Sequence, residues 1–404
     1  MSFNPRGSKP TDAYAGITMV SNAVMPDQLG GLQRYVRQLA RAVAAKGTPV
    51  TIITKRVSRE LPSQEQFPDG VQIHRYDIPQ RSSPLYALGY PFASLRATRA
   101  ASSAAGVLHV HYPLQGVAPA ILGARYIHTF HAPIYRELLP EHQDRYVLPK
   151  RLRGVLVNVA RAGEARVAAR SQETIVLTEY MRGELDLLSP KAADRAITVP
   201  AGLDSEFFSP GAGIVHEAAQ SAEPLLFTAR RLVPRTGVSE LVKAMPAVLA
   251  KLPSAHLAIA GDGPLRTEIS VLLRDLLLEE KVTLLGRLSD RDLRDWYRGA
   301  DLFVLPTQEL EGFGMSTTEA LACGTPAVGT PVGGTPEILR PIDERLIAPG
   351  ATPDDIASAI IEIVTTDGLL DCLASRVRDH VVPSMDWSTI ADRHLEIYER
   401  TGVG

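Results

Sequence analysis

Short apolar runs alternate with helical patterns along most of this chain, and no other feature restricts the fold as strongly. Such runs, bounded by Gly, Pro or polar residues, are typical of parallel strands that helices bury on both faces. A first series of expected strands comprises Ile17–Ser21, Val50–Thr54, Val71–Arg75, Val107–His111, Tyr126–Phe130, Thr174–Thr178 and Ala196–Val199. A second comprises Leu225–Ala229, His256–Ala260, Val282–Leu285, Leu302–Leu305 and Pro326–Val328. The alternation predicts an α/β protein with doubly wound parallel sheets.

The two series are separated by a stretch from Pro200 to about Glu223 that is rich in Ala, Gly and Ser. At 404 residues the chain is long for one core, since domains usually hold roughly 100–200 residues. We therefore predict a first Rossmann-like domain over residues 1–205 and a second over 206–383. The last helical pattern, from Trp387 to Arg400, is expected to leave the second domain, so that residues 384–404 pack on the first.

Composition excludes several classes of protein. The net charge of −2 argues against a general nucleic-acid binder. The two cysteines, Cys323 and Cys372, have no ligand spacing, so a disulfide framework and a zinc site are not expected. The chain has no apolar run of about 18 residues and no apolar signal core at its start. We expect a cytoplasmic enzyme.

Two carboxylates eight residues apart, Glu311 and Glu319, flank a glycine-rich turn between an expected strand and an expected helix. Ser316 and Glu319 have the spacing of a capping box, which predicts that the helix begins there. A helix start leaves backbone N–H groups free and favours anions. The spacing alone leaves two interpretations open: a ligand site, or a helix cap beside a solvated loop residue.

Other strand ends carry polar or flexible residues, and ligands bind beyond the carboxyl ends of parallel strands. Gly30 and Gly31 open the helix after the first strand and permit close approach of a ligand, although such a pair often only makes a turn. The G-x-G-x-x-G fingerprint is absent there, which argues against a dehydrogenase. His131 ends the strand Tyr126–Phe130 and can donate to a sugar hydroxyl or an oxyanion.

Three arginines, Arg230, Arg231 and Arg235, follow the first strand of the second series. Guanidinium groups bind phosphate in a bidentate fork, so these side chains can neutralise a diphosphate. The alternative is a solvated basic loop. The single Asp-x-Asp, Asp290 to Asp292, follows Ser289 and is expected to open a helix rather than to bind a cation.

Taken together, these segments resemble the retaining GT-B glycosyltransferases of family 4. The strongest element is E-G-F-G-M-S-T-T-E, which matches the family's E-x7-E motif. It is followed by A-C-G-T-P and by V-G-G-T-P-E-I-L at Val332–Leu339. Supporting elements are the Gly30-Gly31 helix start, T-F-H ending at His131, V-P-A-G-L-D at Val199–Asp204, and G-D-G-P at Gly261. The resemblance covers nearly the whole chain and implies two Rossmann-like domains facing a central cleft.

The resemblance also implies roles for individual residues. Glu311 would hold hydroxyls of the donor sugar, and Glu319 the ribose of the nucleotide. Arg231 would contact the diphosphate. His131 would face the sugar at the reaction centre, and Gly31 would approach the β-phosphate. The remaining contacts would come from Gly314, Met315 and Ser316 at the sugar and diphosphate, and from backbone near Gly286, Arg287 and Leu288 at the base.

The chain departs from the family pattern at two positions. Thr236 stands where a lysine usually precedes the glycine of the arginine loop, and Ala201 stands where asparagine is common. A missing ammonium would remove charge stabilisation from the leaving oxygen unless another cation replaces it. Arg230 and Arg235 are the candidates for that replacement.

The implied reaction transfers a sugar from a nucleoside-diphosphate sugar to an acceptor with retention of configuration, and needs neither a metal nor a cofactor. The alternatives are the same donor site with a thiol, amine or small natural product as acceptor, and a catalytically silent nucleotide-sugar-binding protein. The acceptor pocket would lie in the first domain, whose loops include Pro79–Pro91. No nucleic acid partner is expected.

Two further interpretations of partners stay open. A basic stretch from Arg145 to Arg170 alternates with apolar residues such as Val155 and Val159. It predicts either a helix whose apolar side packs in the first domain or a weak peripheral contact with an anionic membrane. The second open interpretation is that the chain forms a homo-oligomer.

Overall fold

The computed structural model describes residues 16–28, 30–78, 95, 106–137, 150–213 and 223–402. The chain divides into two compact units. The first unit comprises Met1–Leu177, Met181–Gly202 and Trp387–Gly404, and the second comprises Thr178–Tyr180 and Leu203–Asp386. The chain passes from the first unit to the second between Gly202 and Leu203 and returns between Asp386 and Trp387.

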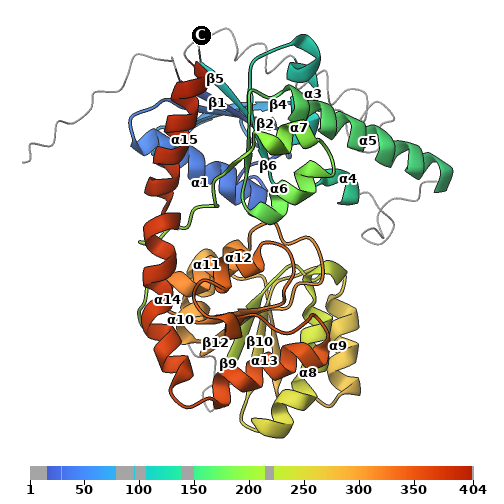
Figure 1. Ribbon diagram of the computed structural model, residues 1–404, viewed down its shortest axis with the longest axis vertical. Helices are drawn as coiled ribbons and strands as arrows, with labels where there is room; N and C mark the ends of the chain where they lie inside the picture. The colour runs from blue at the N-terminus through green and yellow to red at the C-terminus, as the bar shows by residue number, and fades with distance from the viewer. Residues whose placement is uncertain are drawn as a thin grey trace, which may run out of the picture. The chain divides into compact units, whose positions relative to one another are not determined.

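The first unit contains an eight-stranded sheet with the strand order β3-β4-β2-β1-β5-β6-β7-β8 (Figure 1). The strands are β1 (Ile17–Val20), β2 (Val50–Lys55), β3 (Gln64–Gln66), β4 (Gln72–Tyr76), β5 (Val107–Val110), β6 (Ile127–Phe130), β7 (Glu173–Val176) and β8 (Ile197–Thr198). All neighbours pair in parallel except β3 and β4, which are antiparallel. β1 and β5 lie side by side at the centre, with Ile17 opposite Val107.

Several described helices belong to the first unit. They are α1 (Gly31–Ala45), α3 (Pro113–Leu122), α4 (Ile134–Glu137), α5 (Lys150–Arg170), α6 (Glu179–Asp186), α7 (Pro190–Asp194) and α15 (Trp387–Gly402). α1 packs with α15, and α5 packs with α3, α4 and α7. The last helix thus returns to the first unit, as expected. Its Tyr398 hydroxyl lies 2.8 Å from Nδ1 of His109 on β5.

The second unit contains a five-stranded parallel sheet with the order β11-β10-β9-β12-β13. Its strands are β9 (Leu225–Ala229), β10 (His256–Ala260), β11 (Val282–Gly286), β12 (Leu302–Leu305) and β13 (Ala327–Gly329). β9 and β10 are almost wholly buried, which explains their mainly apolar sequences. The order runs outward in both directions from β9, so the sheet is doubly wound.

Helices cover both faces of this second sheet (Figure 1). They are α8 (Val238–Lys251), α9 (Arg266–Asp275), α10 (Asp290–Gly299), α11 (Met315–Ala322), α12 (Thr335–Leu339), α13 (Pro353–Thr365) and α14 (Leu369–Met385), with 3-10 turns η3 (Pro234–Thr236) and η4 (Glu344–Leu346). α8 packs with α9 and α13, whereas α11 packs with α10 and α14. Ser289 caps α10 by accepting from the amide of Asp292 at 3.1 Å, so the Asp-x-Asp opens a helix as predicted.

The structure adds one strand and revises the expectation for α5. β3 was not expected, because Gln64–Gln66 is a polar edge strand without an apolar signal. In α5, Val155 and Val159 are 61% and 63% exposed, whereas Val167 is buried. Among the helix residues whose side chains the structure describes, 154–170, the apolar side therefore packs along the C-terminal half. Residues 79–91 and 145–149 lie outside the described ranges.

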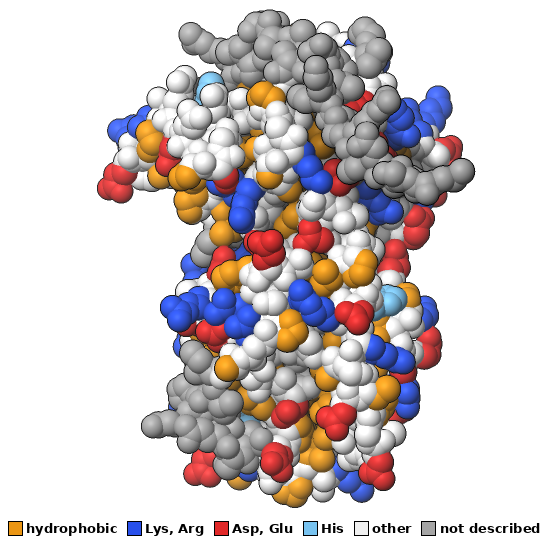
Figure 2. All heavy atoms as spheres, turned by 90° about the vertical axis from the view of Figure 1, so that its left-hand side faces the viewer, with side chains coloured by type: hydrophobic (Ala, Val, Ile, Leu, Met, Phe, Trp, Pro, Cys, Tyr) orange, Lys and Arg blue, Asp and Glu red, His pale blue; other side chains and the backbone are white. Residues whose placement is uncertain are grey.

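Two further features, the character of the helices and the distribution of surface charge, bear on function. Within the described ranges, no helix combines the length and the apolar character needed to cross a membrane. On the face shown in Figure 2, acidic and basic side chains are interspersed over the second unit rather than gathered by sign. This mixed distribution agrees with the net charge of −2.

Candidate functional site

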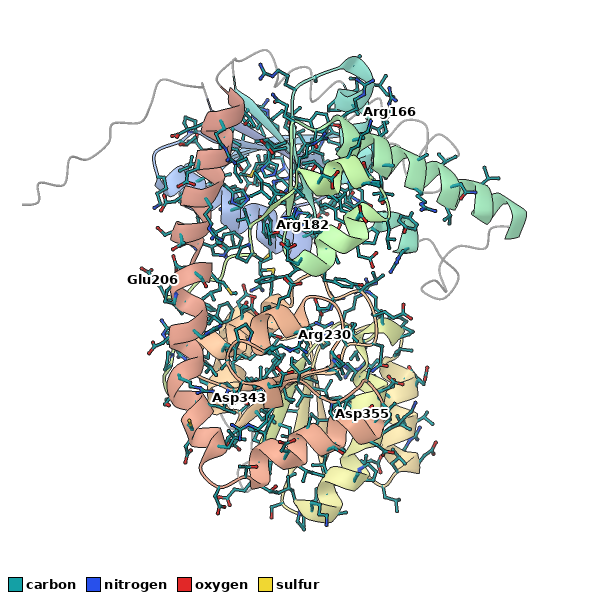
Figure 3. The ribbon with its side chains drawn as sticks, in the orientation of Figure 1. Arg166, Arg182, Glu206, Arg230, Asp343 and Asp355 are labelled. Carbon is teal, nitrogen blue, oxygen red and sulfur yellow. The ribbon has the colours of Figure 1, made fainter. Side chains whose placement is uncertain are left out.

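The second unit brings its polar strand-end residues together where the strand order reverses. β9 and β12 are neighbours, and their loops leave the same edge of the sheet toward opposite sides. Such a switch point is where doubly wound sheets bind ligands. Arg230 directly follows β9, and Figure 3 shows it among the loops that leave the strands. Glu311 lies in the loop after β12.

Arg230 and Glu311 form an ion pair across this switch point. Nη2 of Arg230 lies 2.7 Å from Oε2 of Glu311, and the two side chains are only 10% and 12% exposed. The hydroxyl of Thr307 lies 3.1 Å from the same Nη2 and 3.2 Å from the same carboxylate oxygen. Nε of Arg230 is buried and has no hydrogen-bond partner among the described residues. The arginine is thus held at the switch point by Nη2, while its Nε–H has no partner among the described residues.

The loop that carries Glu311 has an unusual backbone. Leu310 has a φ of 52°, in the region that non-glycine residues rarely adopt. Gly334 donates its amide to the Glu311 carbonyl at 2.9 Å. At Gly333, with a φ of 66°, a Cβ would lie 2.2 Å from that carbonyl oxygen. The glycines of the V-G-G-T-P segment therefore fit closely around the backbone of Glu311.

The other two arginines of the β9 loop differ in their surroundings. Arg231 is exposed. Arg235 donates from Nη1 to the carbonyl of Leu310 at 3.3 Å, which ties the β9 loop to the β12 loop. Arg230 and Arg235 thus both reach the segment around Glu311, whereas Arg231 faces solvent.

Thr236 points into its own turn. The side chain is buried, and its hydroxyl lies 2.7 Å from the carbonyls of both Arg231 and Val233. The next residue, Gly237, has a φ of 73°, and a Cβ there would meet the carbonyl of Pro306 at 1.7 Å. At the position where the resemblance leads one to expect a lysine, the threonine stabilises the shape of the arginine loop.

The start of α11 differs from the sequence prediction. The helix begins at Met315, its N-cap is Gly314 with a φ of 90°, and no side chain caps it. The capping box of Ser316 and Glu319 was therefore wrong, because the left-handed glycine starts the helix one residue earlier. The first two amides of the helix have no intrahelical acceptor, and such a terminus favours anions.

Glu319 has a different structural partner. It is buried on α11, and its Oε2 accepts a hydrogen bond from the hydroxyl of Tyr297 on α10 at 3.1 Å. This contact joins residues 22 positions apart and orients the carboxylate. No local spacing in the sequence signals it.

The residues that follow β11 are more exposed to solvent than those that follow β9 and β12. Gly286 has a φ of 70° and accepts from the amide of Gly261 at 2.7 Å, so the G-D-G-P turn packs beside it. Arg287 is 73% exposed on its side chain and lies 3.6 Å from Asp262, and Leu288 is half-buried. A pair this exposed contributes little stability.

In the first unit, the expected site residues follow β1 and β6. Gly30 and Gly31 are exposed, and a Cβ at Gly31 would meet nothing within 4 Å. His131 is half-buried after β6, and its Nε2 lies 3.3 Å from Nδ1 of His111, which follows β5. His111 was not singled out from the sequence, although His109 and His111 alternate along one strand as residues of one face do.

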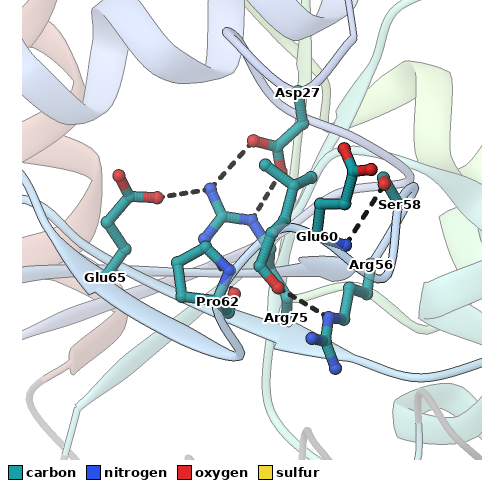
Figure 4. Close-up of polar contacts among 8 residues, drawn as sticks. Asp27, Arg56, Ser58, Glu60, Pro62, Glu65 and Arg75 are labelled. Carbon is teal, nitrogen blue, oxygen red and sulfur yellow. Dashed lines mark hydrogen bonds and ion pairs between the residues drawn. The ribbon is translucent and has the colours of Figure 1, made fainter.

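A buried ionic network anchors the loop that leads to Gly30. Nε and Nη2 of Arg75 lie 2.6 and 2.8 Å from the two carboxylate oxygens of Asp27, and both side chains are fully buried (Figure 4). Arg75 also donates to Glu65 at 2.7 Å and to the carbonyl of Pro62 at 3.1 Å. The bidentate pair fixes the β1–α1 loop to β4.

Two family models match the chain. Residues 215–379 match the model described as Glycosyl transferases group 1, and residues 29–207 match Glycosyltransferase Family 4. The first match contains the β9 loop, Glu311 and Glu319. The second contains His131 and most of the described first sheet.

Curated relatives and solved structures extend the similarity to most of the chain. The D-inositol 3-phosphate glycosyltransferase of Frankia alni is 31% identical over 358 residues, which are 82% of this chain and 85% of the relative. That of Thermomonospora curvata is 28% identical and covers 91% and 90%. Sucrose-phosphate synthase from Thermosynechococcus elongatus is 22% identical, covers 95% and 98%, and superposes with a TM-score of 0.76.

Proposed function

Because this chain belongs to glycosyltransferase family 4 and is therefore a sugar-transferring enzyme of the GT-B fold, we propose that its donor is a nucleoside-diphosphate sugar and that transfer retains the anomeric configuration. One observation carries the proposal. The buried pair of Arg230 and Glu311 lies at the switch point of the second sheet. The site thus offers a carboxylate for sugar hydroxyls beside guanidinium and helix-terminal groups for phosphate.

In this proposal the donor replaces the internal ion pair with contacts of its own. Glu311 accepts hydrogen bonds from hydroxyls of the donor sugar. Arg230 turns its guanidinium, including the unpaired Nε, toward the diphosphate. A buried charge without a partner destabilises the protein, so the Arg230 guanidinium and the Glu311 carboxylate each need a contact with the ligand in place of their ion pair. A donor that carries both hydroxyls and a diphosphate satisfies both groups at once.

The leaving diphosphate is stabilised by positive groups on two loops. Arg231, which is exposed, supplies a second guanidinium. The N-terminal amides of α11, at Met315 and Ser316, supply the positive end of the helix dipole. These groups take the role that a metal ion fills elsewhere, so the reaction proceeds without one. Preorganised donors of this kind are worth several kcal/mol in the transition state.

The nucleotide ribose is assigned to Glu319, whose carboxylate is oriented by Tyr297. The acceptor attacks from the face that the nucleoside diphosphate leaves. The departing phosphate oxygen takes the acceptor's proton, so no separate protein base is needed. His131 is assigned to the donor sugar as a hydrogen-bond donor, as the resemblance to the family implies.

The proposal is tested first with the donor. A thermal-shift screen of UDP, GDP, ADP and dTDP sugars identifies the base, because a ligand that binds the native state raises its melting temperature. Turnover is then measured with and without EDTA, using inositol phosphate among the acceptors because two relatives are named for it. The anomeric configuration of the product is read by NMR.

Variants locate the donor site. Glu311→Ala and Arg231→Ala should each lower turnover at least about tenfold, equivalent to roughly 1.4 kcal/mol of barrier. Arg274→Ala on α9 is the matched control, because it removes an exposed arginine away from the switch point. Near-normal turnover in the first two variants would reject the proposed site. Tight donor binding without transfer or hydrolysis would reject the proposed reaction.

A further inference from the structure

Five of the ten histidines, all in the first unit, come from or directly follow β5, β6 and α15. His109 and His111 come from β5 and its end, His128 and His131 from β6 and its end, and His394 from α15. The rings of His109 and His111 lie 3.9 Å apart between centroids, and those of His111 and His131 lie 5.6 Å apart. The rings of His109, His111, His131 and His394 thus lie together near the end of β5, and His128 contacts the backbone of Val110 there.

These histidines are neutral at physiological pH. Burial lowers the pKa of His131 to about 3 and the pKa of His128 and of His394 to about 4. Burial also lowers the pKa of His109 and of His111 well below the ordinary range. The remaining variable at each ring is which nitrogen carries the single proton.

Backbone carbonyls fix that proton in two of the rings. Nδ1 of His128 lies 3.0 Å from the carbonyl of Val110, and Nδ1 of His394 lies 2.8 Å from the carbonyl of Ile390. A carbonyl can only accept, so both rings carry their proton on Nδ1. Nε2 of His394 then accepts from the hydroxyl of Tyr35 at 3.2 Å.

The contact between His111 and His131 has two arrangements. In one, His111 donates from Nδ1 to Nε2 of His131. In the other, His131 donates from Nε2 to Nδ1 of His111, and the proton of His111 is then on its own Nε2. That Nε2 is buried and has no partner among the described residues. The second arrangement therefore leaves a buried N–H without an acceptor, which proteins rarely tolerate.

We propose that His111 is a positioning residue for His131: it donates from Nδ1 to Nε2 of His131 at 3.3 Å and so holds the proton of His131 on Nδ1. The ring of Tyr35 meets His131 edge-on, with centroids 4.8 Å apart and planes at 80°, and limits its rotation. His131, which is half-buried, then presents a neutral N–H donor whose identity does not change across physiological pH.

The consequence for catalysis rests on the proposed function, in which His131 donates to the donor sugar. A ring with its proton on Nε2 would offer the sugar a lone pair instead of a donor. The bond to His111 therefore selects the tautomer that can donate. His111 itself is buried and acts only through His131.

The tautomer is measured directly, without reference to any activity. Long-range 1H–15N correlation spectra of the full chain labelled in histidine distinguish protonated from bare ring nitrogens, and the His131→Asn spectrum assigns the His131 signals. We expect a protonated Nδ1 and a bare Nε2 for His131 at neutral pH. A protonated Nε2 in the wild-type chain would overturn the proposal.

Three substitutions separate the donor from the ring. His111→Asn keeps an N–H near the Nδ1 position, His111→Gln moves it toward the Nε2 position, and His111→Phe keeps the ring without a donor. We expect His131 to retain its tautomer in H111N and to become a tautomer mixture in H111F and H111Q. An unchanged His131 tautomer in H111F would overturn the proposal, and thermal unfolding of each variant confirms that it is folded.

Kinetics add a second readout. H111F and H111Q should lower kcat about tenfold with little change in KM for the donor, because the lost bond matters in the transition state. H111N should stay within about twofold of the wild-type kcat. Equal losses in H111N and H111F would contradict a role for the donated bond, because H111N keeps an N–H at that position and H111F does not. If the wild-type chain shows no transfer, the proposed function fails while the NMR result still decides the tautomer.

Discussion

The guanidinium of Arg230 lies 2.7 Å from the carboxylate of Glu311 across the switch point of the second sheet, and both side chains are close to nine-tenths buried. Each charge is thus compensated by the other at a site that is largely shielded from water. The pair places a negative and a positive charge at the proposed donor site. In the proposal the carboxylate binds the hydroxyls of the donor sugar and the guanidinium binds the diphosphate.

This pair predicts a strong energetic coupling. Arg230→Met leaves the Glu311 carboxylate buried without its partner and should lower the free energy of unfolding by about 3 kcal/mol. Adding Glu311→Gln should restore much of that loss, because no unpaired charge remains. Urea unfolding of the wild-type chain, both single variants and the double variant measures the coupling. Additive losses would show that the two side chains do not interact in solution.

Thr236 should contribute to the stability of its loop. Its hydroxyl shares one proton between two carbonyls, each at 2.7 Å. Thr236→Val keeps the shape and removes the proton, so the free energy of unfolding should fall by about 1 kcal/mol. Thr236→Ser keeps the hydroxyl and serves as the control. Equal melting temperatures for the valine variant and the wild type would contradict this role.

The histidine cluster makes stability depend on pH. The pKa of His128 is about 4 in the folded chain, lowered chiefly by burial, and about 6.5 when unfolded. Between these values the unfolded state binds a proton that the folded state does not, so stability falls as pH falls. In this range each such histidine lowers the free energy of unfolding by about 1.4 kcal/mol for each pH unit of acidification. The stability that comes from keeping the histidine neutral is fully present above about pH 6.5.

A pair of variants isolates this slope. His128→Asn keeps a donor toward the Val110 carbonyl but cannot titrate, so its stability should fall less between pH 6.5 and pH 5 than that of the wild type. His380→Gln, which removes an exposed histidine, is the matched control variant. Chemical unfolding at several pH values makes the comparison. An identical slope for H128N would mean that His128 is protonated in the folded state.

The two cysteines should differ in reactivity. Burial raises the pKa of the Cys323 thiol to about 12, whereas Cys372 is exposed. Because the thiolate is the reactive form, a maleimide should label one thiol quickly in the native chain and two after unfolding. Cys372→Ser should abolish the fast labelling. Rapid modification of Cys323 in that variant would indicate that α11 opens readily.

The sequence predicts the alternating elements well because buried parallel strands leave continuous apolar runs. Leu225–Ala229 and His256–Ala260 were found with the observed bounds for this reason. The polar edge strand Gln64–Gln66 has no such signal and was missed. The helix after Glu311 was expected, but its start was misplaced, because a left-handed Gly314 caps it without any side chain.

The contacts within the site were harder to predict than the positions of its residues. Arg230 and Glu311 both follow strands, and the sequence places them at strand ends. Their pairing depends on β9 and β12 being neighbours, which needs the strand order. The contact of Tyr297 with Glu319 and that of His111 with His131 likewise join separate elements. Local spacing carries no information about such contacts.

The two ends of the second unit lie next to each other, which bears on how the chain can be divided. The amide of Leu203 donates to the carbonyl of Met385 at 2.7 Å, and Leu203 forms a parallel bridge with Asp386. The chain thus enters and leaves this unit through adjacent residues. Apart from Thr178–Tyr180, the unit is one uninterrupted segment, so cutting the chain at these two points would divide none of its strands.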